Sequence, residues 1–521
     1  MRRWVRFCIR MCLACLLLCV TNIVSFEFMM YRIIFMMLAL LASACVFAGG
    51  KDDKVRHRIL VSTDLGGTDP DDNQSMIHLL MYSNEFDIEG LVSSPSYGSG
   101  SKEEILRMID MYEKDLPKLQ QGLKNAQRAM AKKGKRGAAG KHGKEVEEPI
   151  VSKGSKFPSA DYLRSITKQG HKGMCPLKGW GEPTEGSQWI VDCARRDDSR
   201  PLWILVWGAL EDVAQALHDA PDIEKNIRIY WIGGPNKKWG SDGYRYIVEH
   251  HPDVWFIENN ASYRGFISDA KEKTPYQALF YENAMKGCGV MGNDFINYYK
   301  GIAKMGDTPA LLYLMGKDKD GRPFDACNPE KDHWGGRFER MEQSPRYIIT
   351  GPLCSADTVP TYALMEWRIK GPVLEGTDCP KHLLRGERGA FTLRTDRQDW
   401  QGCYVGDGTY VVTYAPKAPA TLSYTITSDI PGFPVHEGVF TVGEQWPAVG
   451  RYSTESPTIT SQPYALGNAW WTDCSHESLK SGKSDYEDYA EHNSKWQGAA
   501  TVSVWREMVM RDWQQRFKWL K

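Results

Sequence analysis

Four aspartates lie within nine residues of one short segment: Asp64, Asp69, Asp71 and Asp72. Like charges at this spacing repel one another unless a cation or shared protons neutralise them. Carboxylate oxygens in a loop that Gly66-Gly67 can bend suit Ca²⁺ or Mg²⁺ and not zinc. A solvated turn with an aspartate helix cap would explain one or two of these residues, but not four. The segment therefore predicts a site for a hard divalent cation.

The elements around this segment must bring its carboxylates to one place. The pattern of a buried strand at residues 58–62 precedes the segment, and a helical pattern follows from Asp71. A carboxylate at a helix start is favoured by capping and by the helix dipole. Further along, we expect strands at 88–93, 202–207, 227–232 and 254–257, with helices at 105–112 and 211–218. This alternation predicts an α/β fold with a mainly parallel sheet flanked by helices, and function at the carboxyl ends of the strands.

Two stretches interrupt the alternation. Residues 121–149 are rich in Lys, Arg, Gly and Ala, which predicts a flexible basic insert. The insert lies in an α/β domain that we expect to span residues 50–375. An alternative role for the insert is contact with an anionic surface. Residues 376–450 change to short strands with turns, which predicts an inserted, small β-sandwich-like module. Residues 451–521 end in a helix with Trp505 and Trp513 on one face, which we expect to complete the α/β domain.

The first 49 residues carry the pattern of an export signal. Basic residues precede two apolar runs, Cys12–Val20 and Ile33–Ala48, and small residues end the second run. This is typical of a secretory signal cleaved after Ala48. A lipid-modified Cys45 and a membrane hairpin are the alternatives, although both runs are shorter than the roughly 20 residues that a spanning helix prefers. We expect an exported protein, periplasmic, surface-located or secreted, whose mature chain spans no membrane.

Composition excludes several other classes of protein. The 521 residues include 65 Lys and Arg against 65 Asp and Glu, so the formal net charge is zero and a dedicated nucleic-acid binder is not expected. Apolar residues make up 42%, which is enough for a core and excludes global disorder. The eight cysteines after the leader contain no CxxC spacing, so a zinc site is not expected, and their pairing cannot be read from sequence.

Several ordered segments resemble one family. The chain is similar to nucleoside hydrolases, and more closely to secreted bacterial nucleoside hydrolase-like proteins first described as cellulose-binding. The resemblance covers most of residues 58–118 and 150–350. It is carried by Ile59–Ser75, Phe157–Ser165, Trp255–Asn260 with Arg264-Gly265, and Trp334–Phe338. It implies a nucleoside hydrolase-like α/β fold, with the β-rich stretch as an insertion rather than a tail.

The resemblance also implies roles for the acidic residues. Asp64 and Asp72, together with Asp307, match the calcium carboxylates, and Glu211 occupies the place where the family offers a backbone carbonyl to the metal. Asp71 matches the general base. In such a site, Ca²⁺ lowers the pKa of the attacking water, and the base takes its proton as an oxocarbenium-like sugar forms.

Sugar-binding residues follow from the same resemblance. Hydroxyl groups of the ligand would be held by Asp69, Glu258, Asn259 and Asn260. The chain departs from the family at Gly306, where a histidine often stands, so a donor of a proton to the leaving group is missing. His333, with His250 and His251, is a replacement candidate, although a lone histidine is more often a packed or surface residue.

Two functions of different classes fit these residues. The first is an exported, calcium-dependent hydrolase of an N- or O-glycosidic bond. The second is a non-catalytic carbohydrate-binding protein that keeps the metal site to recognise a sugar diol. The expected partner is a sugar, a nucleoside-like small molecule or an oligosaccharide, and assembly into a homo-oligomer is compatible with either function. Asp71 favours the first function, and the missing leaving-group donor favours the second.

Overall fold

The computed structural model describes residues 56–66, 71–135, 149–267, 284–298, 303–317, 322–376, 379–445, 452–476, 479 and 496–521. The expected signal region, Asp69 and the basic residues 136–148 lie outside these ranges. Across the described part of the chain, no helix has both the length and the apolar character needed to cross a bilayer.

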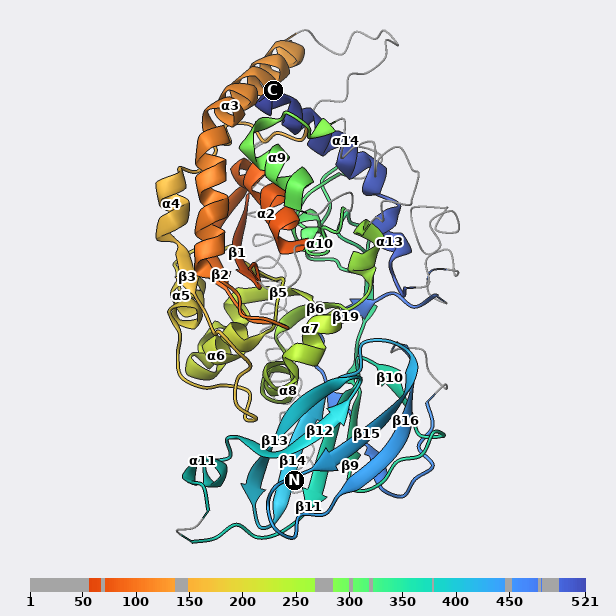
Figure 1. The fold of residues 1–521 in the computed structure, drawn as a ribbon. Helices are drawn as coiled ribbons and strands as arrows, with labels where there is room; N and C mark the ends of the chain where they lie inside the picture. Colours follow the sequence, from red (N-terminus) through yellow and green to blue (C-terminus); the bar gives the residue numbers. More distant parts are fainter. Residues whose placement is uncertain are drawn as a thin grey trace, which may run out of the picture. The chain divides into compact units, whose positions relative to one another are not determined.

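The main domain is built on an eight-stranded sheet with the order β3-β2-β1-β4-β5-β6-β19-β7 (Figure 1). All neighbours pair in parallel except β19 and β7, which are antiparallel. The predicted mainly parallel α/β fold is therefore confirmed. The strands are β1 (His57–Thr63), β2 (Phe86–Ser93), β3 (Thr167–Gln169), β4 (Leu202–Val206), β5 (Ile227–Ile232), β6 (Trp255–Asn259), β7 (Phe338–Arg340) and β19 (Trp470–Asp473).

Side chains along the central strands alternate between two apolar cores. In β1, Ile59 and Val61 belong to one core and Leu60 to the other. Successive strand residues point to opposite faces, so a strand covered on both faces must be apolar at consecutive positions. This is the physical reason why residues 59–61 are apolar at consecutive positions.

Helices cover both faces of the sheet (Figure 1). The first core is shared with α2 (Asp71–Met81), α3 (Lys102–Lys135), α9 (Gly289–Tyr298) and α14 (Arg506–Phe517). The second is shared with α5 (Glu185–Ala194), α6 (Glu211–Asp219) and α8 (Ser241–His250). Shorter helices are α4 (Ala160–Ser165), α7 (Gly234–Trp239), α10 (Thr308–Leu312) and α13 (Ala500–Ser503), with 3-10 turns η1 (Ser83–Glu85), η2 (Pro221–Asn226), η3 (Ser262–Phe266) and η5 (Lys518–Leu520).

The first half of the predicted basic insert is helical, which corrects the expectation of a flexible segment from residue 121. Helix α3 continues to residue 135, and Leu119 and Leu123 are buried in the core. A Cβ atom on Gly122 would lie 2.2 Å from Cγ of Trp519, so the helix lies directly against the end of the chain. These apolar contacts stabilise the helix despite its basic composition.

The last helix completes the α/β domain. Trp513 of α14 stacks on His78 of α2, with ring centroids 4.4 Å apart. The guanidinium of Arg516 is fully buried and donates to the carbonyl of Met81 at 2.7 Å and to Oδ1 of Asn84 at 2.6 Å. Residues more than 400 positions apart in the sequence therefore close one core.

The contact between His78 and Trp513 predicts a pH-dependent stability. Burial, and then the nearby positive charge of Arg516, lower the pKa of His78 to about 3. The unfolded chain takes up this proton near pH 6.5, so stability is lost as the pH falls below that value. We expect His78→Phe, which keeps an aromatic ring, to remove ~2 kcal/mol of the difference in unfolding free energy between pH 7 and pH 5. Urea unfolding of both proteins at the two pH values measures this, and equal pH dependence would contradict it.

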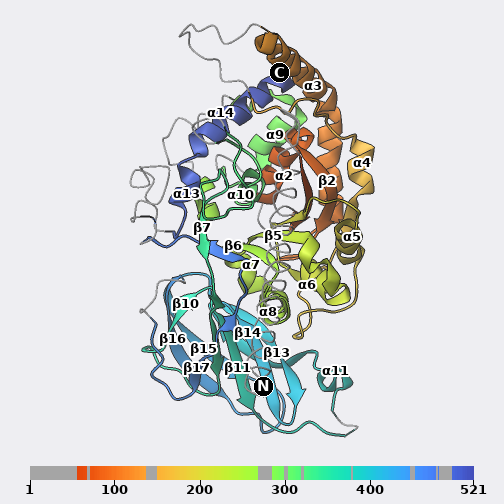
Figure 2. The same cartoon turned by 180° about the vertical axis from the view of Figure 1, so that it is seen from behind.

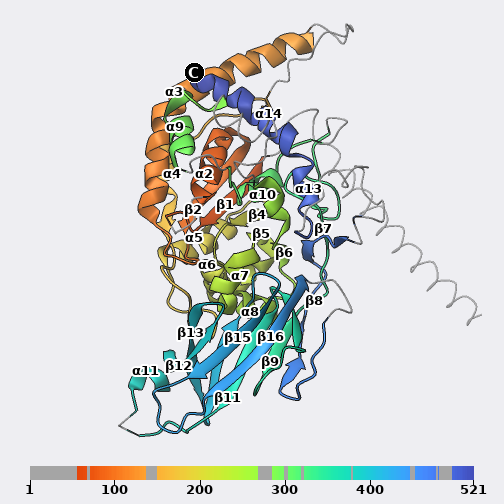
Figure 3. The same cartoon turned by 45° about the vertical axis from the view of Figure 1, so that its right-hand side comes forward.

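The β module is one continuous sheet of nine strands with the order β10-β16-β15-β12-β13-β14-β11-β9-β17 (Figure 3). The predicted inserted β module is therefore present, and its nine strands are joined in one sheet with a core of its own. The strands are β9 (Arg346–Ile349), β10 (Thr358–Thr361), β11 (Leu364–Lys370), β12 (Arg388–Thr395), β13 (Gln398–Gly406), β14 (Thr409–Tyr414), β15 (Ala420–Thr427), β16 (His436–Gln445) and β17 (Ile459–Ser461). Helix α11 (Lys381–Leu384) joins β11 to β12, and β8 (Gln343–Ser344) and β18 (Tyr464–Ala465) form a separate pair.

The module is wider than the predicted residues 376–450. Strand β11 pairs with β14, and Trp367 of β11 lies fully buried in the module's own core. Strands β9 to β11 belong to the module for this reason, although they precede the change in composition. The chain leaves the α/β sheet after β7 and returns as β19, which pairs with β7, so the module is inserted within the α/β domain (Figure 2).

Candidate metal and ligand-binding site

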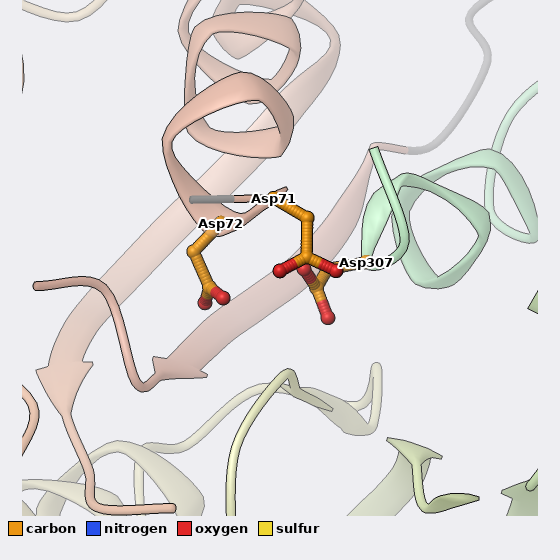
Figure 4. Close-up of side chains that lie close together, drawn as sticks. All are labelled: Asp71, Asp72 and Asp307. Carbon is orange, nitrogen blue, oxygen red and sulfur yellow. The ribbon is translucent and has the colours of Figure 1, made fainter. Parts of the chain in front are cut away.

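Three carboxylates meet beyond the carboxyl end of β1. Asp71 and Asp72 form the first turn of α2, and Asp307 directly precedes α10 (Figure 4). One oxygen from each of the three lies within 4.8 Å of the other two. Two segments more than 200 residues apart in sequence thus supply one cluster of oxygen ligands.

The electrostatics of this cluster favour a bound cation. Asp72 is 2% exposed and accepts a hydrogen bond from the hydroxyl of Thr63. Burial raises the pKa of Asp72 well above its ordinary value, and the charges of Asp307, Asp64 and Asp71 raise it further. A set of buried carboxylates is stable when a positive charge neutralises it, and an all-oxygen set suits hard cations. The donors present therefore fit a divalent metal ion.

Asp71 differs from its two neighbours in its surroundings. Its side chain is 13% exposed, and Nζ of Lys304 lies 3.5 Å from its Oδ2. A Cβ atom on Gly306 would lie only 2.5 Å from the same oxygen, which is closer than a side chain can approach. A side chain at position 306 would therefore require the Asp71 carboxylate to move.

The cluster opens into a cavity of about 490 Å³, which lies in the size range of small-molecule sites. The predicted residues Asp64, Asp71, Asp72 and Asp307 all line it. The remaining lining is aromatic, polar and basic: Ser96, Tyr97, Trp207, Ile232, Pro235, Asn236, Trp239, Tyr263, Arg264, Ile267, Lys304, Gln398 and Lys417. The predicted aspartates thus form one part of the lining of a larger site.

The side chains of Glu258, Asn259 and Asn260 are not part of this lining, which corrects the prediction that they hold sugar hydroxyls. Glu258 is buried against Lys237 and accepts from Nδ2 of Asn260 at 2.7 Å. Asn259 accepts from the backbone N–H of Tyr263 at 2.9 Å. These side chains are occupied by hydrogen bonds that support α7 and η3, whose residues do reach the cavity.

Two further predicted residues also lie outside the lining. Both ring nitrogens of buried His333 contact backbone carbonyl oxygens, of Lys331 at 2.8 Å and of Asp325 at 3.0 Å, so the ring is a packed one rather than a ligand contact. The side chain of Glu211 lies against Sγ of Cys175 at 3.8 Å, and burial raises its pKa to about 8. The role assigned to Glu211 concerns its backbone carbonyl and stays a prediction.

Sequence reasoning missed the basic and aromatic half of the cavity. Tyr97 lies in the turn after β2, and Trp239 ends α7, where a single aromatic residue gives no functional signal. Lys417 and Gln398 come from the inserted module, and nothing in their local sequence connects them with the aspartates. Arg264 and Trp207, by contrast, stand in segments that resemble the family.

Several solved structures are similar to this chain at low sequence identity. No protein of curated function matches the chain. A nucleoside hydrolase-related hypothetical protein from Saccharophagus degradans, described as associated with carbohydrate metabolism, is 16% identical over 75% of this chain and 100% of its own, with a TM-score of 0.40. The inosine-uridine preferring nucleoside hydrolase from Bacillus anthracis is 14% identical over 50% of this chain and 81% of its own, with a TM-score of 0.30.

One family model also matches the chain. Residues 58–338 match the family described as cellulose-binding Sde182, nucleoside hydrolase-like domain. The match begins at β1 and ends at β7, so it includes the acidic cluster and the strands up to the insertion. Because it spans more than half of the chain, the protein belongs to this family of nucleoside hydrolase-like domains.

Proposed function

We propose that this protein is an exported, calcium-dependent hydrolase of a glycosidic bond in a carbohydrate. The observation that carries the proposal is the meeting of Asp71 with Asp72 and Asp307 at the mouth of one cavity. The carbohydrate class is supported by the cellulose-binding description of the family and by the carbohydrate association of the Saccharophagus relative.

The acidic residues divide the chemistry between them. Asp64, Asp72 and Asp307 would hold the cation, since they are the carboxylates matched to metal ligands. Bound Ca²⁺ supplies positive charge that polarises a water and orients sugar hydroxyls. Asp71, more exposed and beside Lys304, accepts a proton from the attacking water at its carboxylate while positive charge develops on the sugar.

A non-catalytic carbohydrate-binding protein is the second candidate. One observation favours it: the described lining of the cavity contains no histidine that could protonate a leaving group. A chain that binds a diol but cannot protonate a leaving group would recognise a sugar without cleaving it. A screen of glycosides and nucleosides, with and without chelator, separates the two candidates, because only the hydrolase releases a reducing sugar.

The metal assignment predicts a calcium-dependent stability. A cation that binds only the folded chain stabilises it by ~2.7 kcal/mol at a concentration 100 times its dissociation constant. We expect Ca²⁺ to raise the melting temperature of chelator-treated protein, and Asp72→Asn to abolish that rise. Asp161→Asn, in the first turn of α4 with a 91% exposed side chain, is the matched control and should keep it. Scanning calorimetry that shows no calcium dependence would refute the metal site.

Export is proposed from the apolar run at 33–48 and the small residues that end it. N-terminal sequencing of protein recovered from outside the cytoplasm should begin at Gly49. Retention of the full leader in the cytoplasmic fraction would contradict the proposal.

A further inference from the structure

The inserted module supplies part of the cavity wall. Gln398 begins β13, and Lys417 lies between β14 and β15, yet both line the same cavity as the aspartates. The cavity therefore extends from the acidic cluster of the α/β domain to the module. A ligand that fills it contacts both.

The module is fixed on helix α7, which also contributes residues to the cavity lining. Asp396 binds Nζ of Lys238 at 2.5 Å, and Trp400 stacks on Trp239 with ring centroids 5.4 Å apart. The side chain of Lys238 is 1% exposed, so this ion pair is partly shielded from solvent. Charges attract one another more strongly away from water than in it. These contacts flank Gln398 and hold it in place over α7.

A second anchor fixes the module to α8. Asp242 is 3% exposed and receives two hydrogen bonds from the module, from Nη2 of Arg388 at 2.6 Å and from the hydroxyl of Thr413 at 2.7 Å. Removing one partner of such a buried pair is costly, because the other charge stays buried. These ion pairs and hydrogen bonds therefore fix the module residues of the cavity lining relative to α7 and α8.

An aromatic platform lies beside these module residues. Tyr97 and Trp239 stand with ring centroids 4.7 Å apart, and Tyr97 is 59% exposed although it belongs to the cavity lining. Exposed aromatic faces in a polar cavity suit the C–H faces of a sugar ring, while neighbouring polar groups bind its hydroxyls. This platform is separate from the acidic cluster, so it offers a place for a second sugar unit.

The charge on this side of the cavity is positive. Nζ of Lys417 lies 5.8 Å from the ring centroid of Trp239, and Lys417 makes no ion pair with the described residues. Arg264 also lines the cavity, whereas Lys304 already faces Asp71. Once a divalent cation offsets the aspartates, the basic residues leave the lining with a net positive charge, which favours an anionic ligand.

We propose that the module forms a second sugar subsite, in which Tyr97 and Trp239 stack on a sugar unit and Lys417 binds its negative group. The ligand is then an acidic oligosaccharide, with a carboxylate or a sulfate on the unit next to the one at the aspartates. This inference rests on the proposed function in two respects, because it takes the first sugar unit to lie at the acidic cluster and a bound cation to offset the charge of the aspartates.

The test is titration calorimetry on the full chain carrying Asp71→Asn, because this variant should not hydrolyse the probes during the measurement. The probes are galacturonic acid, digalacturonic acid, its neutral counterpart galactobiose, and a sulfated chondroitin disaccharide. We expect one acidic disaccharide to bind at least about 10-fold more tightly than galactobiose and galacturonic acid, the scale of one charge-assisted hydrogen bond. The carboxylated and sulfated probes distinguish the two acid groups.

Variants assign this preference to the subsite. Lys417→Gln should remove the preference for acid, and Tyr97→Ala should weaken disaccharides at least 5-fold while leaving galacturonic acid unchanged. Lys381→Gln, an exposed lysine of the module outside the cavity, is the matched control and should change nothing. Equal affinity for acidic and neutral disaccharides, an unchanged preference in Lys417→Gln, or no binding of any acidic probe at millimolar concentration would overturn the inference.

Asp72→Asn separates this inference from the proposed function. If acidic disaccharides bind this variant as tightly as before, with the same response to Lys417→Gln, the subsite stands and the calcium-dependent site fails. If galacturonic acid binds in a calcium-dependent way and the second unit adds nothing, the subsite fails alone.

Discussion

Replacing Asp71 by asparagine is expected to lower the turnover of a validated glycoside substrate by about 100-fold or more. The substitution keeps the size of the side chain and the helix start, but it removes the carboxylate that accepts the proton. Ligand affinity should change little, because Asp72 and Asp307 of the cluster remain to hold the cation, with Asp64 in the same cavity lining. Steady-state kinetics of the purified variant at saturating calcium measure the effect, with kcat falling and KM nearly constant.

Two controls make the result specific to Asp71. Asp161→Asn changes an exposed carboxylate at the start of α4 and should leave turnover intact. Asp72→Asn should reduce metal and ligand binding together, which is a different signature. If Asp71→Asn turns over substrate at the original rate, the base has been assigned to the wrong residue. If no substrate is cleaved but a sugar binds only with calcium, the binding-protein candidate is the correct one.

The largest loss of stability is expected at Asp473, on the strand that follows the insertion. Its carboxylate is fully buried and accepts from the backbone N–H groups of Asn260 and Ala261 at 3.0 Å and of Ser262 at 2.8 Å. Asp473→Ala would leave these donors buried without an acceptor, at ~1–3 kcal/mol each. We therefore expect a loss of at least ~3 kcal/mol in the free energy of unfolding, measured by urea denaturation.

The same substitution should also disturb the cavity, since the turn that Asp473 holds leads into Tyr263 and Arg264. The matched control is Asp429→Ala, an exposed aspartate of the β module, for which we expect less than ~0.5 kcal/mol. A destabilisation of Asp473→Ala that equals this control would mean that water replaces the carboxylate, and the proposed support of the turn would be wrong.

The parts of the fold that sequence predicted are those with a local signal. The consecutive apolar residues Ile59, Leu60 and Val61 indicated a buried strand, and they are apolar because β1 is covered on both faces. Asp71 and Asp72 were found for the same kind of reason, because charges so close together need a compensating partner. The C-terminal helix was found from its period, with Trp513 on the buried face.

The failures concern contacts that no local pattern encodes. Polar residues at the end of a strand have the same sequence pattern whether they face a ligand or a neighbouring helix. The carboxylate of Glu258 pairs with Lys237 and accepts a hydrogen bond from Tyr244, and both partners come from helices earlier in the chain. The β module was predicted too short because β11 precedes the change in composition and is defined by its pairing with β14. Lys417 could reach the cavity only through the docking of the whole module, which depends on tertiary packing.

Because the module interrupts the α/β sheet between β7 and β19, that sheet cannot be completed in step with synthesis. β7 ends at Arg340 and β19 begins at Trp470, so roughly 130 residues separate two strands that pair directly. A ribosome needs on the order of ten seconds for this stretch, at about 5–20 residues per second. During that interval the edge of β6 has no neighbouring strand, whereas every strand of the module, from β9 to β17, is synthesised before β19. The nascent chain thus carries a complete insert on an incomplete sheet, and only the synthesis of β19 allows that sheet to be completed.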